Sequence, residues 1–427
     1  MKTVLVTTLT SVPAGGVNTR EMHLARLIVG RGWRMVFALA WGSRFHDPLL
    51  FRRIHPDAET VLLDGRTGTR DGRWRAVRRA IQHVNPAVVM PGALADTFEV
   101  VRQEKHRGGS ARLVYGLPGV HDGANAFVNA YSGIVDQAFG VSRLTTQLLE
   151  TACGIPASRV HYVPTGVVLP ARLTQLDHRG PIRIGYVGRF DDDKRPMDLT
   201  ALCAELEARG LDYQAIAVGG GSLAESLARA AAATPRLRVL SPVTVDQLYD
   251  SVYPQLDACL LFSAREGMPN SLLEAMAHGV VPVTSDFVGR ETEGLIEDGR
   301  TGMVFPVGGI ESAADRIVQL ASDRALRQRL GAMARKTVEA KHSLEVMGDR
   351  FVGVLEAALE CEPALASIPP LPERGSSRLS RWVGGDAAEQ LRRLCGKRFN
   401  HTDDDGEWPR IGKIIPAAAS PANNARG

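Results

Sequence analysis

Short apolar runs alternate with helix-like segments along most of this chain, and the alternation occurs in two blocks. Runs that are apolar on both faces and separated by helices are typical of parallel sheets covered on both sides. The first block covers residues 3–8, 34–39, 60–63, 87–91, 112–116, 135–142 and 159–167, and the second covers 182–188, 213–221, 236–241, 257–263, 280–285 and 302–307. We therefore predict an α/β protein with two doubly wound, Rossmann-like domains that face a cleft, where the carboxyl ends of the strands converge.

The length of 427 residues also favours two domains over a single core. The predicted parts are an N-terminal domain, a linker that lacks the strand pattern, a second domain, a helix and a proline-rich, partly disordered tail, at residues 1–168, 169–181, 182–342, 343–361 and 362–427. Within the tail only residues 378–394 could form a helix, because the rest lacks periodicity. The sequence assigns the tail no role.

The composition of the sequence indicates the cellular compartment in which the protein works and the partners it is expected to have. The five cysteines are scattered and form no CxxC pair, which favours free thiols in a reducing compartment. No apolar run approaches the ~18 residues that a membrane span needs. The N-terminal segment has a single Lys2, an apolar stretch broken by threonines and no convincing cleavage site, so we interpret it as a first buried strand. We expect a cytoplasmic protein without a nucleic-acid partner.

The segment EGMPNSLLEAMAHGVVPV, at residues 266–283, carries two carboxylates, Glu266 and Glu274, with seven residues between them. The residues after Glu266 are typical of a turn and a helix start, and Gly279 is placed to end the helix. The start of a helix offers free N–H groups and the positive end of a dipole to phosphate. Carboxylates accept hydrogen bonds from sugar and ribose hydroxyls. This strand–loop–helix segment would suit a phosphorylated sugar.

At these residues the sequence resembles the family 4 glycosyltransferases, retaining enzymes of the GT-B fold that use nucleotide-activated sugars. The resemblance covers roughly residues 2 to 360. It implies that Glu266 faces the donor sugar, that Glu274 accepts the ribose hydroxyls, and that the last helix crosses back to the N-terminal domain. It also implies that backbone groups from Met268 through Leu272, including Asn270 and Ser271, surround the sugar and the diphosphate. Met-Pro-Asn stands where many relatives have an aromatic-glycine pair, which puts the sugar preference in doubt.

A second segment, GYVGRFDDDKRP at residues 185–196, places Arg189 and Lys194 five residues apart after a strand. Two fixed cations there would stabilise the negative charge that develops on a leaving diphosphate. The pattern resembles the G-R-x-x-x-x-K segment of the family, which implies the diphosphate role for both residues. The alternative is a pair of solvated charges. Asp191–Asp193 suggest a metal site, but the two cations would already supply that charge, so we expect no metal.

Four further residues are candidates. Gly15 and Gly16 lie between the first strand and its helix, where backbone can approach a phosphate, and their position matches the glycine pair of the family. His121 resembles the histidine that relatives place against the donor sugar, although Leu117-Pro118-Gly119 lengthens the spacing after the strand. Its neighbour Asp122 is a weaker candidate. Val243, next to Pro242, could hold the nucleobase through backbone contacts. Two residues of the first helical turns, Arg20 and Glu21, are possible cleft residues. The glycines Gly219–Gly221 form the turn after the strand at 213–218, and we expect their role to be structural.

Residues 70–84 predict a basic amphipathic helix with an apolar stripe on one face. Two interpretations remain open: a contact with anionic lipid or an acidic acceptor, or a layer helix with its stripe on the sheet and its arginines in water. The arginines are Arg70, Arg73, Arg75, Arg78 and Arg79, and the stripe is Trp74, Val77, Ile81 and Val84.

Taken with the resemblance, these residues predict a hexosyl-type glycosyltransferase that moves a sugar from a nucleoside diphosphate sugar to a hydroxyl-bearing acceptor. Uridine is favoured only by its prevalence in the family, and retention at the anomeric carbon is implied by the resemblance alone. The acceptor is open between a glycan, a lipid-linked saccharide and a small metabolite. The alternatives are a nucleotide-sugar epimerase of the same fold and a sugar-nucleotide-binding protein without turnover.

Overall fold

The computed structural model describes residues 1–8, 16–41, 48–65, 70–92, 94–120, 122–171, 173–174, 176, 179–365 and 378–396. They form two compact units. Unit 1 consists of residues 1–141, 145–163 and 348–427, and unit 2 consists of 142–144 and 164–347. Residues 169–181, predicted as a linker, belong to unit 2, where Leu176 is buried in the core.

Unit 1 is built on a parallel seven-stranded sheet with the order β3-β2-β1-β4-β5-β6-β7. The strands are β1 (Lys2–Thr8), β2 (Trp33–Trp41), β3 (Thr60–Asp64), β4 (Val88–Gly92), β5 (Arg112–Leu117), β6 (Gln137–Gly140) and β7 (Val160–Tyr162). The order reverses between β1 and β4, which is the topological switch point of a doubly wound sheet. Each strand predicted in the first block is present.

Unit 2 repeats the arrangement with six parallel strands in the order β10-β9-β8-β11-β12-β13. They are β8 (Ile182–Val187), β9 (Tyr213–Val218), β10 (Leu237–Leu240), β11 (Ala258–Leu261), β12 (Val281–Ser285) and β13 (Met303–Phe305). The switch point lies between β8 and β11, and the predicted strands of the second block are all present.

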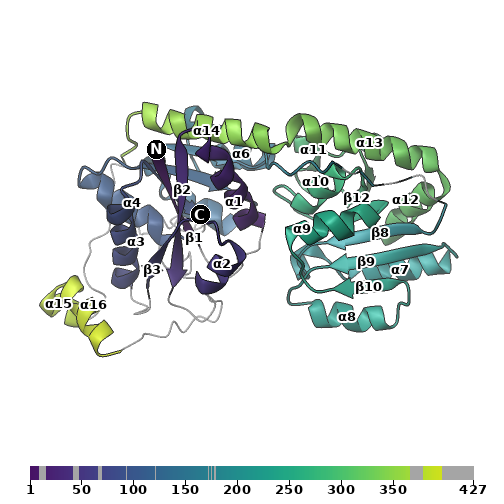
Figure 1. Cartoon of the computed structure of the whole chain (residues 1–427), viewed down its shortest axis with the longest axis horizontal. Helices are drawn as coiled ribbons and strands as arrows, with labels where there is room; N and C mark the ends of the chain where they lie inside the picture. Colours follow the sequence, from purple (N-terminus) through teal and green to yellow (C-terminus); the bar gives the residue numbers. More distant parts are fainter. Residues whose placement is uncertain are drawn as a thin grey trace, which may run out of the picture. The chain divides into compact units, whose positions relative to one another are not determined.

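Helices cover the sheets, as the buried strands require (Figure 1). In unit 1 these are α1 (Gly16–Val29), α2 (Pro48–Ile54), α3 (Arg70–Val84), α4 (Asp96–His106), α5 (Asp122–Asn129), α6 (Arg143–Thr151), and the short η1 (Ser132–Ile134) and η2 (Ala157–Arg159). In unit 2 they are η3 (Asp192–Lys194), α7 (Asp198–Ala208), α8 (Ala224–Ala232), α9 (Val245–Gln247), η4 (Leu248–Val252), η5 (Tyr253–Gln255), α10 (Asn270–Ala277), α11 (Arg290–Glu293), α12 (Ile310–Ser322) and α13 (Arg324–Lys341).

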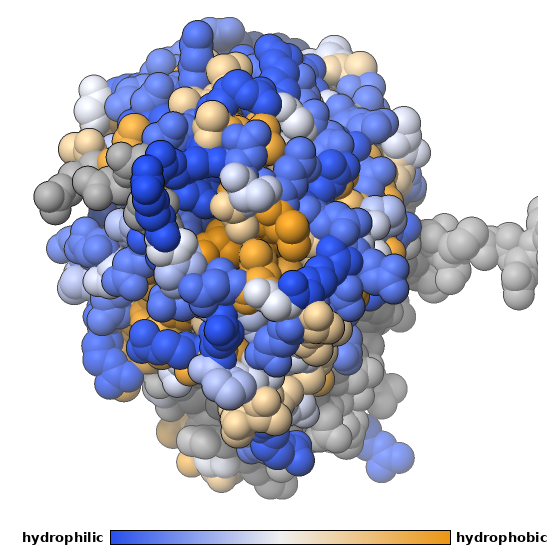
Figure 2. All heavy atoms as spheres, turned by 90° about the vertical axis from the view of Figure 1, so that its right-hand side faces the viewer, coloured by the Kyte–Doolittle hydropathy of each residue, from blue (hydrophilic) through white to orange (hydrophobic). Residues whose placement is uncertain are grey.

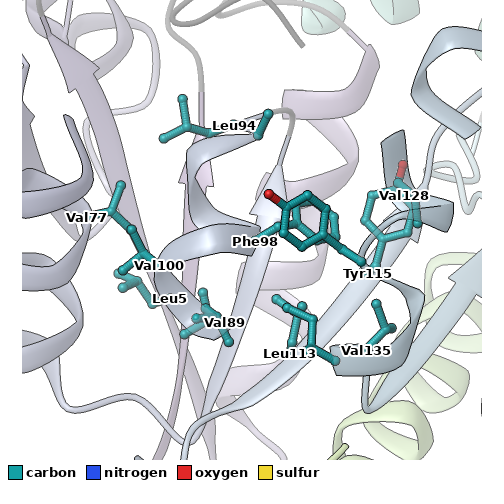
Figure 3. Packing of buried hydrophobic residues seen from close by; sticks show 14 of the residues in the cluster. Leu5, Val77, Val89, Leu94, Phe98, Val100, Leu113, Tyr115, Val128 and Val135 are labelled. Carbon is teal, nitrogen blue, oxygen red and sulfur yellow. The ribbon is translucent and has the colours of Figure 1, made fainter. Parts of the chain in front are cut away.

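The core of unit 1 combines aliphatic residues with aromatic rings from both strands and helices (Figure 3). Phe98 of α4 lies at the centre, with its ring centroid 5.5 Å from that of Tyr115 and 5.4 Å from that of Phe127. Both contacts are edge-on, an arrangement that adds to the stabilisation from burial alone.

The helix α14 (Leu344–Glu360) begins in unit 2, and from Gly348 onward its residues belong to unit 1. The predicted crossing helix is therefore present, and the predicted break before it falls between α13 and α14. Its later part is held in unit 1 by a ring contact of Phe351 with Phe139 at 5.5 Å and by a hydrogen bond from Arg112 Nε to the carbonyl oxygen of Ala358, 2.9 Å long.

A buried lysine fixes the chain just after α14. Lys105 Nζ lies 2.6 Å from Asp136 Oδ2 and donates to the carbonyl oxygens of Ile134 and Ala364, each 2.9 Å away. Asp136 in turn accepts hydrogen bonds from the backbone N–H groups of Leu113 and Ala364. Both charged side chains are almost fully buried.

The basic helix α3 differs from both interpretations of its sequence. Its apolar stripe is packed in the core, as predicted, but Arg73 pairs with Asp96 of α4 at 3.0 Å and Arg78 pairs with Glu104 of α4 at 2.9 Å. These two arginines are therefore tied to the neighbouring helix rather than left in water. Contact of α3 with a membrane stays a prediction.

The tail segment 378–394 forms two helices rather than one, α15 (Arg378–Val383) and α16 (Gly385–Leu394). The break is Gly384, whose φ of +79° ends α15. The second helix, α16, packs against α3. The tail was predicted to be partly disordered. Most of its residues lie outside the part of the chain that the structure describes, so this stays a prediction.

Most of the face shown in Figure 2 is hydrophilic, with hydrophobic residues gathered near its centre. In the described part of the chain no helix has the length and apolar character to cross a membrane. All five cysteines are free thiols.

Candidate functional site

Three candidate residues of unit 2 lie where β8 and β11, the two strands at the switch point, reach their carboxyl ends. Arg189 and Lys194 follow β8, and Glu266 follows β11. Because adjacent parallel strands end at the same edge of the sheet, residues 72 positions apart in the sequence come into contact there.

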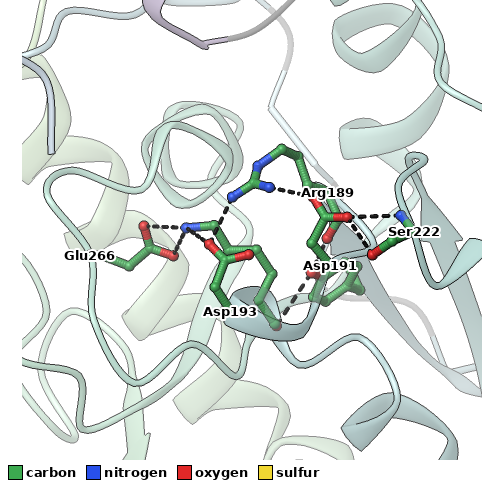
Figure 4. A network of polar contacts seen from close by, with 7 residues as sticks. Arg189, Asp191, Asp193, Ser222 and Glu266 are labelled. Carbon is green, nitrogen blue, oxygen red and sulfur yellow. Dashed lines mark hydrogen bonds and ion pairs between the residues drawn. The ribbon is translucent and has the colours of Figure 1, made fainter. Parts of the chain in front are cut away.

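Lys194 and Glu266 form an ion pair at this edge (Figure 4). Lys194 Nζ donates to Glu266 Oε1 at 2.8 Å and to Oε2 at 2.9 Å. The Glu266 side chain is only 9% exposed and that of Lys194 is 23% exposed, so the pair is shielded from solvent. The structure thus brings together two residues that the sequence assigned to one site.

Arg189 is also paired, with two aspartates of its own loop (Figure 4). Its Nη1 donates to Asp191 Oδ2, and its Nη2 donates to Asp193 Oδ2 at 2.7 Å. Asp191 Oδ1 accepts two further hydrogen bonds, from the N–H and the hydroxyl of Ser222, both 2.8 Å long. These bonds from Ser222 lower the pKa of Asp191 and hold its carboxylate in place.

Tyr186, in β8, supports the loop that carries both cations. Its hydroxyl lies 2.8 Å from the carbonyl oxygen of Arg189 and 3.4 Å from that of Lys194. Its ring stacks on Phe262, the residue that follows β11. One side chain therefore links the loop after β8 to the segment after β11.

The glycine turn after β9 lies against the same loop. A Cβ atom at Gly219 would lie 1.8 Å from the carbonyl oxygen of Gly188, and one at Gly221 would lie 2.7 Å from Asp191 Oδ1. Their φ angles of +155° and +152° are also ones that residues with a side chain rarely adopt, so both positions favour glycine. This close approach gives the turn the structural role that the sequence predicted.

Glu274 lies on α10, with its carboxylate buried beside two aromatic residues. Tyr253 donates a hydrogen bond to Glu274 Oε2 at 2.6 Å. His278 contacts the carbonyl oxygen of Glu274 through Nδ1 at 2.7 Å, and its ring lies 5.1 Å from that of Tyr253. Burial raises the pKa of Glu274 to about 7, and the hydrogen bond from Tyr253 opposes part of that rise.

The start of α10 carries no side-chain cap, because Pro269 occupies the N-cap position. The first backbone N–H groups of this helix that form a hydrogen bond belong to Leu272 and Leu273, and both donate to the carbonyl oxygen of Pro269. The N–H groups of Asn270 and Ser271 make no hydrogen bond with the described residues. They offer the predicted anion-binding position.

The remaining predicted residues lie elsewhere or outside the described part. Val243 is half-buried just before Thr244, which caps α9. Gly16 is the first residue of α1 in unit 1. The predictions on Gly15 and His121 fall outside the described residues. Their roles, like those of the unit 2 residues, stay predictions.

Arg20 and Glu21 are buried in unit 1 near the switch point of its sheet. A Cβ atom at Gly92, at the end of β4, would lie 3.1 Å from Glu21 Oε1, so this carboxylate lies against that strand end. Glu21 Oε2 and Arg20 Nε have no hydrogen-bond partner in the part of the chain that the structure describes. Burial raises the pKa of Glu21 to about 7.

Sequence reasoning did not identify Tyr186, Ser222 or Tyr253. Ser222 directly follows the glycine turn, so its position was a weak local signal. Tyr253 is the first residue of the short helix η5, just before β11, and nothing in its spacing points to Glu274. Their contacts depend on strand order, which a single sequence does not give.

The raised pKa values of Glu21 and Glu274 predict a pH-dependent stability. Their carboxyl groups keep a proton up to about pH 7 in the folded protein but lose it near pH 4.5 when unfolded. Each therefore contributes stability that is fully present below pH 4.5 and is lost as the pH rises through 7, on the order of 3 kcal/mol per group. We expect Glu21→Gln and Glu274→Gln to unfold at a higher temperature than wild type at pH 8, with a smaller difference at pH 5. Identical pH profiles for all three proteins would contradict the assigned protonation.

A family model and several known proteins are similar to part of the second unit. Residues 181–323 match the family model described as "Glycosyl transferases group 1". An alpha-D-kanosaminyltransferase from Streptomyces kanamyceticus is 32% identical over 181 residues, which are 42% of this chain and 46% of that protein. The capsular polysaccharide biosynthesis glycosyltransferase CapM from Staphylococcus aureus is 26% identical over 181 residues, again 42% and 46% of the two chains. The matched region spans less than half the length of either relative.

Solved structures share the fold across both units. The structure of Anabaena Alr3699/HepE in complex with UDP and glucose superposes with a TM-score of 0.68 at 15% identity, covering 84% of this chain and 100% of that chain. At this identity the likeness shows the fold. The predicted GT-B class of two Rossmann-like domains is confirmed, and so is the resemblance to glycosyltransferases, while membership of family 4 stays a prediction.

Proposed function

We propose that this protein is a glycosyltransferase that moves a sugar from a nucleoside diphosphate sugar to a hydroxyl-bearing acceptor. The observation that carries the proposal is the contact between Lys194 and Glu266 at the carboxyl ends of β8 and β11, beside the uncapped start of α10. A cation, a carboxylate and free N–H groups at one sheet edge suit a phosphorylated sugar, because they offer partners to both its phosphates and its hydroxyls.

In the proposed reaction Arg189 and Lys194 stabilise the charge that develops on the diphosphate as the bond to the sugar breaks. Glu266 accepts a hydrogen bond from a hydroxyl of the sugar. Glu274 accepts the ribose hydroxyls, and Tyr253 holds its other oxygen. We further propose retention at the anomeric carbon and a hexosyl donor, as the resemblance to family 4 implies.

The names of the relatives favour transfer over the alternatives. The two curated relatives are named as a glycosyltransferase and a kanosaminyltransferase, and HepE was solved with UDP and glucose. These names support a UDP-sugar as the donor and favour transfer over an epimerase or a binding protein without turnover. We propose that the donor is held without a metal ion, because the two cations supply the positive charge.

Nucleotide binding tests the proposal directly. We expect UDP to raise the unfolding temperature, with stabilisation of about 2.7 kcal/mol at 100 times its dissociation constant, and ADP and GDP to act less. Incubation of a UDP-sugar with candidate acceptors should release UDP and a glycosylated product, and EDTA should leave the rate unchanged. An altered donor in the absence of acceptor would identify an epimerase, and an unaltered donor under all conditions a binding protein. Restoration of activity by magnesium or manganese after EDTA would contradict the metal-independent site.

A further inference from the structure

The acidic run Asp191–Asp193 lies between the two cations of the site, and its three carboxylates have three different surroundings. Asp191 binds both Arg189 and Ser222. Asp193 Oδ2 binds Arg189 Nη2 at 2.7 Å and lies 3.9 Å from Lys194 Nζ. The carboxylate of Asp192 makes no hydrogen bond or ion pair with the described residues. The structure therefore separates three neighbouring carboxylates that look alike in the sequence.

The two partners of Arg189 are held with different strength. Asp191 is anchored by two more hydrogen bonds and its side chain is 26% exposed. Asp193 is 56% exposed and holds Arg189, itself 53% exposed, through a single hydrogen bond. Exposed ion pairs contribute little to stability, so the Asp193 contact is the one that a competing anion can replace.

The charge of these side chains favours such an exchange. Arg189 and Lys194 carry two positive charges, and Asp191, Asp193 and Glu266 carry three negative charges, so these five side chains sum to −1. A diphosphate brought to Arg189 adds negative charge beside Asp193. Nucleotide binding is therefore favoured when the hydrogen bond between Arg189 and Asp193 breaks. Its re-formation favours release of the nucleotide.

We propose that Asp193 is a positioning residue that competes with the diphosphate for Arg189: it gives up the guanidinium when the nucleotide binds and recovers it as the nucleotide leaves. This inference rests on the proposed function of the site. Asp191 has the complementary role, because it keeps Nη1 of Arg189 fixed against the glycine turn whether or not Asp193 is engaged. The competition speeds nucleotide release and weakens equilibrium binding.

The test compares three variants that each remove one negative charge from the same loop. UDP binding is measured by calorimetry and UDP release by stopped flow, on the full chain. We expect Asp193→Asn to bind UDP about fivefold more tightly and to release it more slowly, an effect of about 1 kcal/mol. Asp192→Asn is the matched control and should change the affinity less than twofold, because its charge is not in contact with Arg189. Asp191→Asn should weaken binding, because Arg189 loses its fixed partner.

Salt and turnover separate a competitive role from a structural one. The advantage of Asp193→Asn should shrink as the salt concentration rises, because exposed charges are screened. Under turnover, both KM for the donor and kcat should fall if release limits the rate. Equal affinities for Asp192→Asn and Asp193→Asn would overturn the inference while leaving the proposed function intact. Failure of both wild type and Asp193→Asn to bind UDP, ADP or GDP would overturn the proposed function and this inference with it.

Discussion

Replacement of Lys194 by alanine is expected to lower the turnover of sugar transfer by about 100- to 1000-fold, the loss measured when one preorganised group is removed from a charged transition state. Lys194 holds both oxygens of Glu266, so its removal takes away the charge that faces the diphosphate and also frees the carboxylate that faces the sugar. The measurement is kcat with a UDP-sugar donor, together with circular dichroism to show that the fold is retained.

Two controls give this result its meaning. Lys336→Ala removes an exposed lysine from α13 and should leave turnover unchanged. The double variant Lys194→Ala/Glu266→Gln shows whether the loss comes from the missing cation or from an unpaired, buried carboxylate. Turnover within a few-fold of wild type in Lys194→Ala would remove Lys194 from the reaction and would favour the interpretation as a structural ion pair.

Lys105→Ala should produce the largest loss of stability in unit 1, about 3–5 kcal/mol, the usual cost of leaving one member of a buried ion pair without its partner. The substitution leaves Asp136 charged in the interior and removes the hydrogen bond to the carbonyl oxygen of Ala364. Trp33 and Trp74 are buried in unit 1, and residues 142–144 and 164–347 of unit 2 contain no tryptophan, so unfolding in urea followed by tryptophan fluorescence does not report on unit 2. Lys336→Ala again serves as the control, and a loss below 1 kcal/mol would show that water replaces the lysine at Asp136.

The strands, and the assignment of Lys194 and Glu266 to one site, followed from the sequence because both depend on local patterns, whereas their direct contact was not predicted. Runs that are apolar on both faces predicted every strand of both sheets, and the positions of Glu266 and Lys194 at two strand ends placed them in one site. The structure then put β8 beside β11, which is the fact that joins them.

Partners on distant or irregular segments could not be predicted in this way. The pairing of Arg73 and Arg78 with α4 depends on how two helices pack, which periodicity does not specify. The contact between Tyr253 and Glu274 joins the short helix η5 to α10. The run Asp191–Asp193 suggested a single role, and only the positions of Ser222 and Arg189 show that its members differ.

The discontinuity of unit 1 has a consequence for how the chain is made. Phe139, Arg112 and Lys105 all bind residues between Phe351 and Ala364, which leave the ribosome after the whole of unit 2. Domains generally fold in the order of synthesis, N-terminal first, but here the packing of the N-terminal unit is completed only by a segment made some 190 residues after β7. Unit 2, contiguous apart from three residues, can complete itself sooner. Stop codons and stalled translation in the last part of the message would therefore damage the first-made half of the protein, leaving its apolar α14-binding surface open to chaperones.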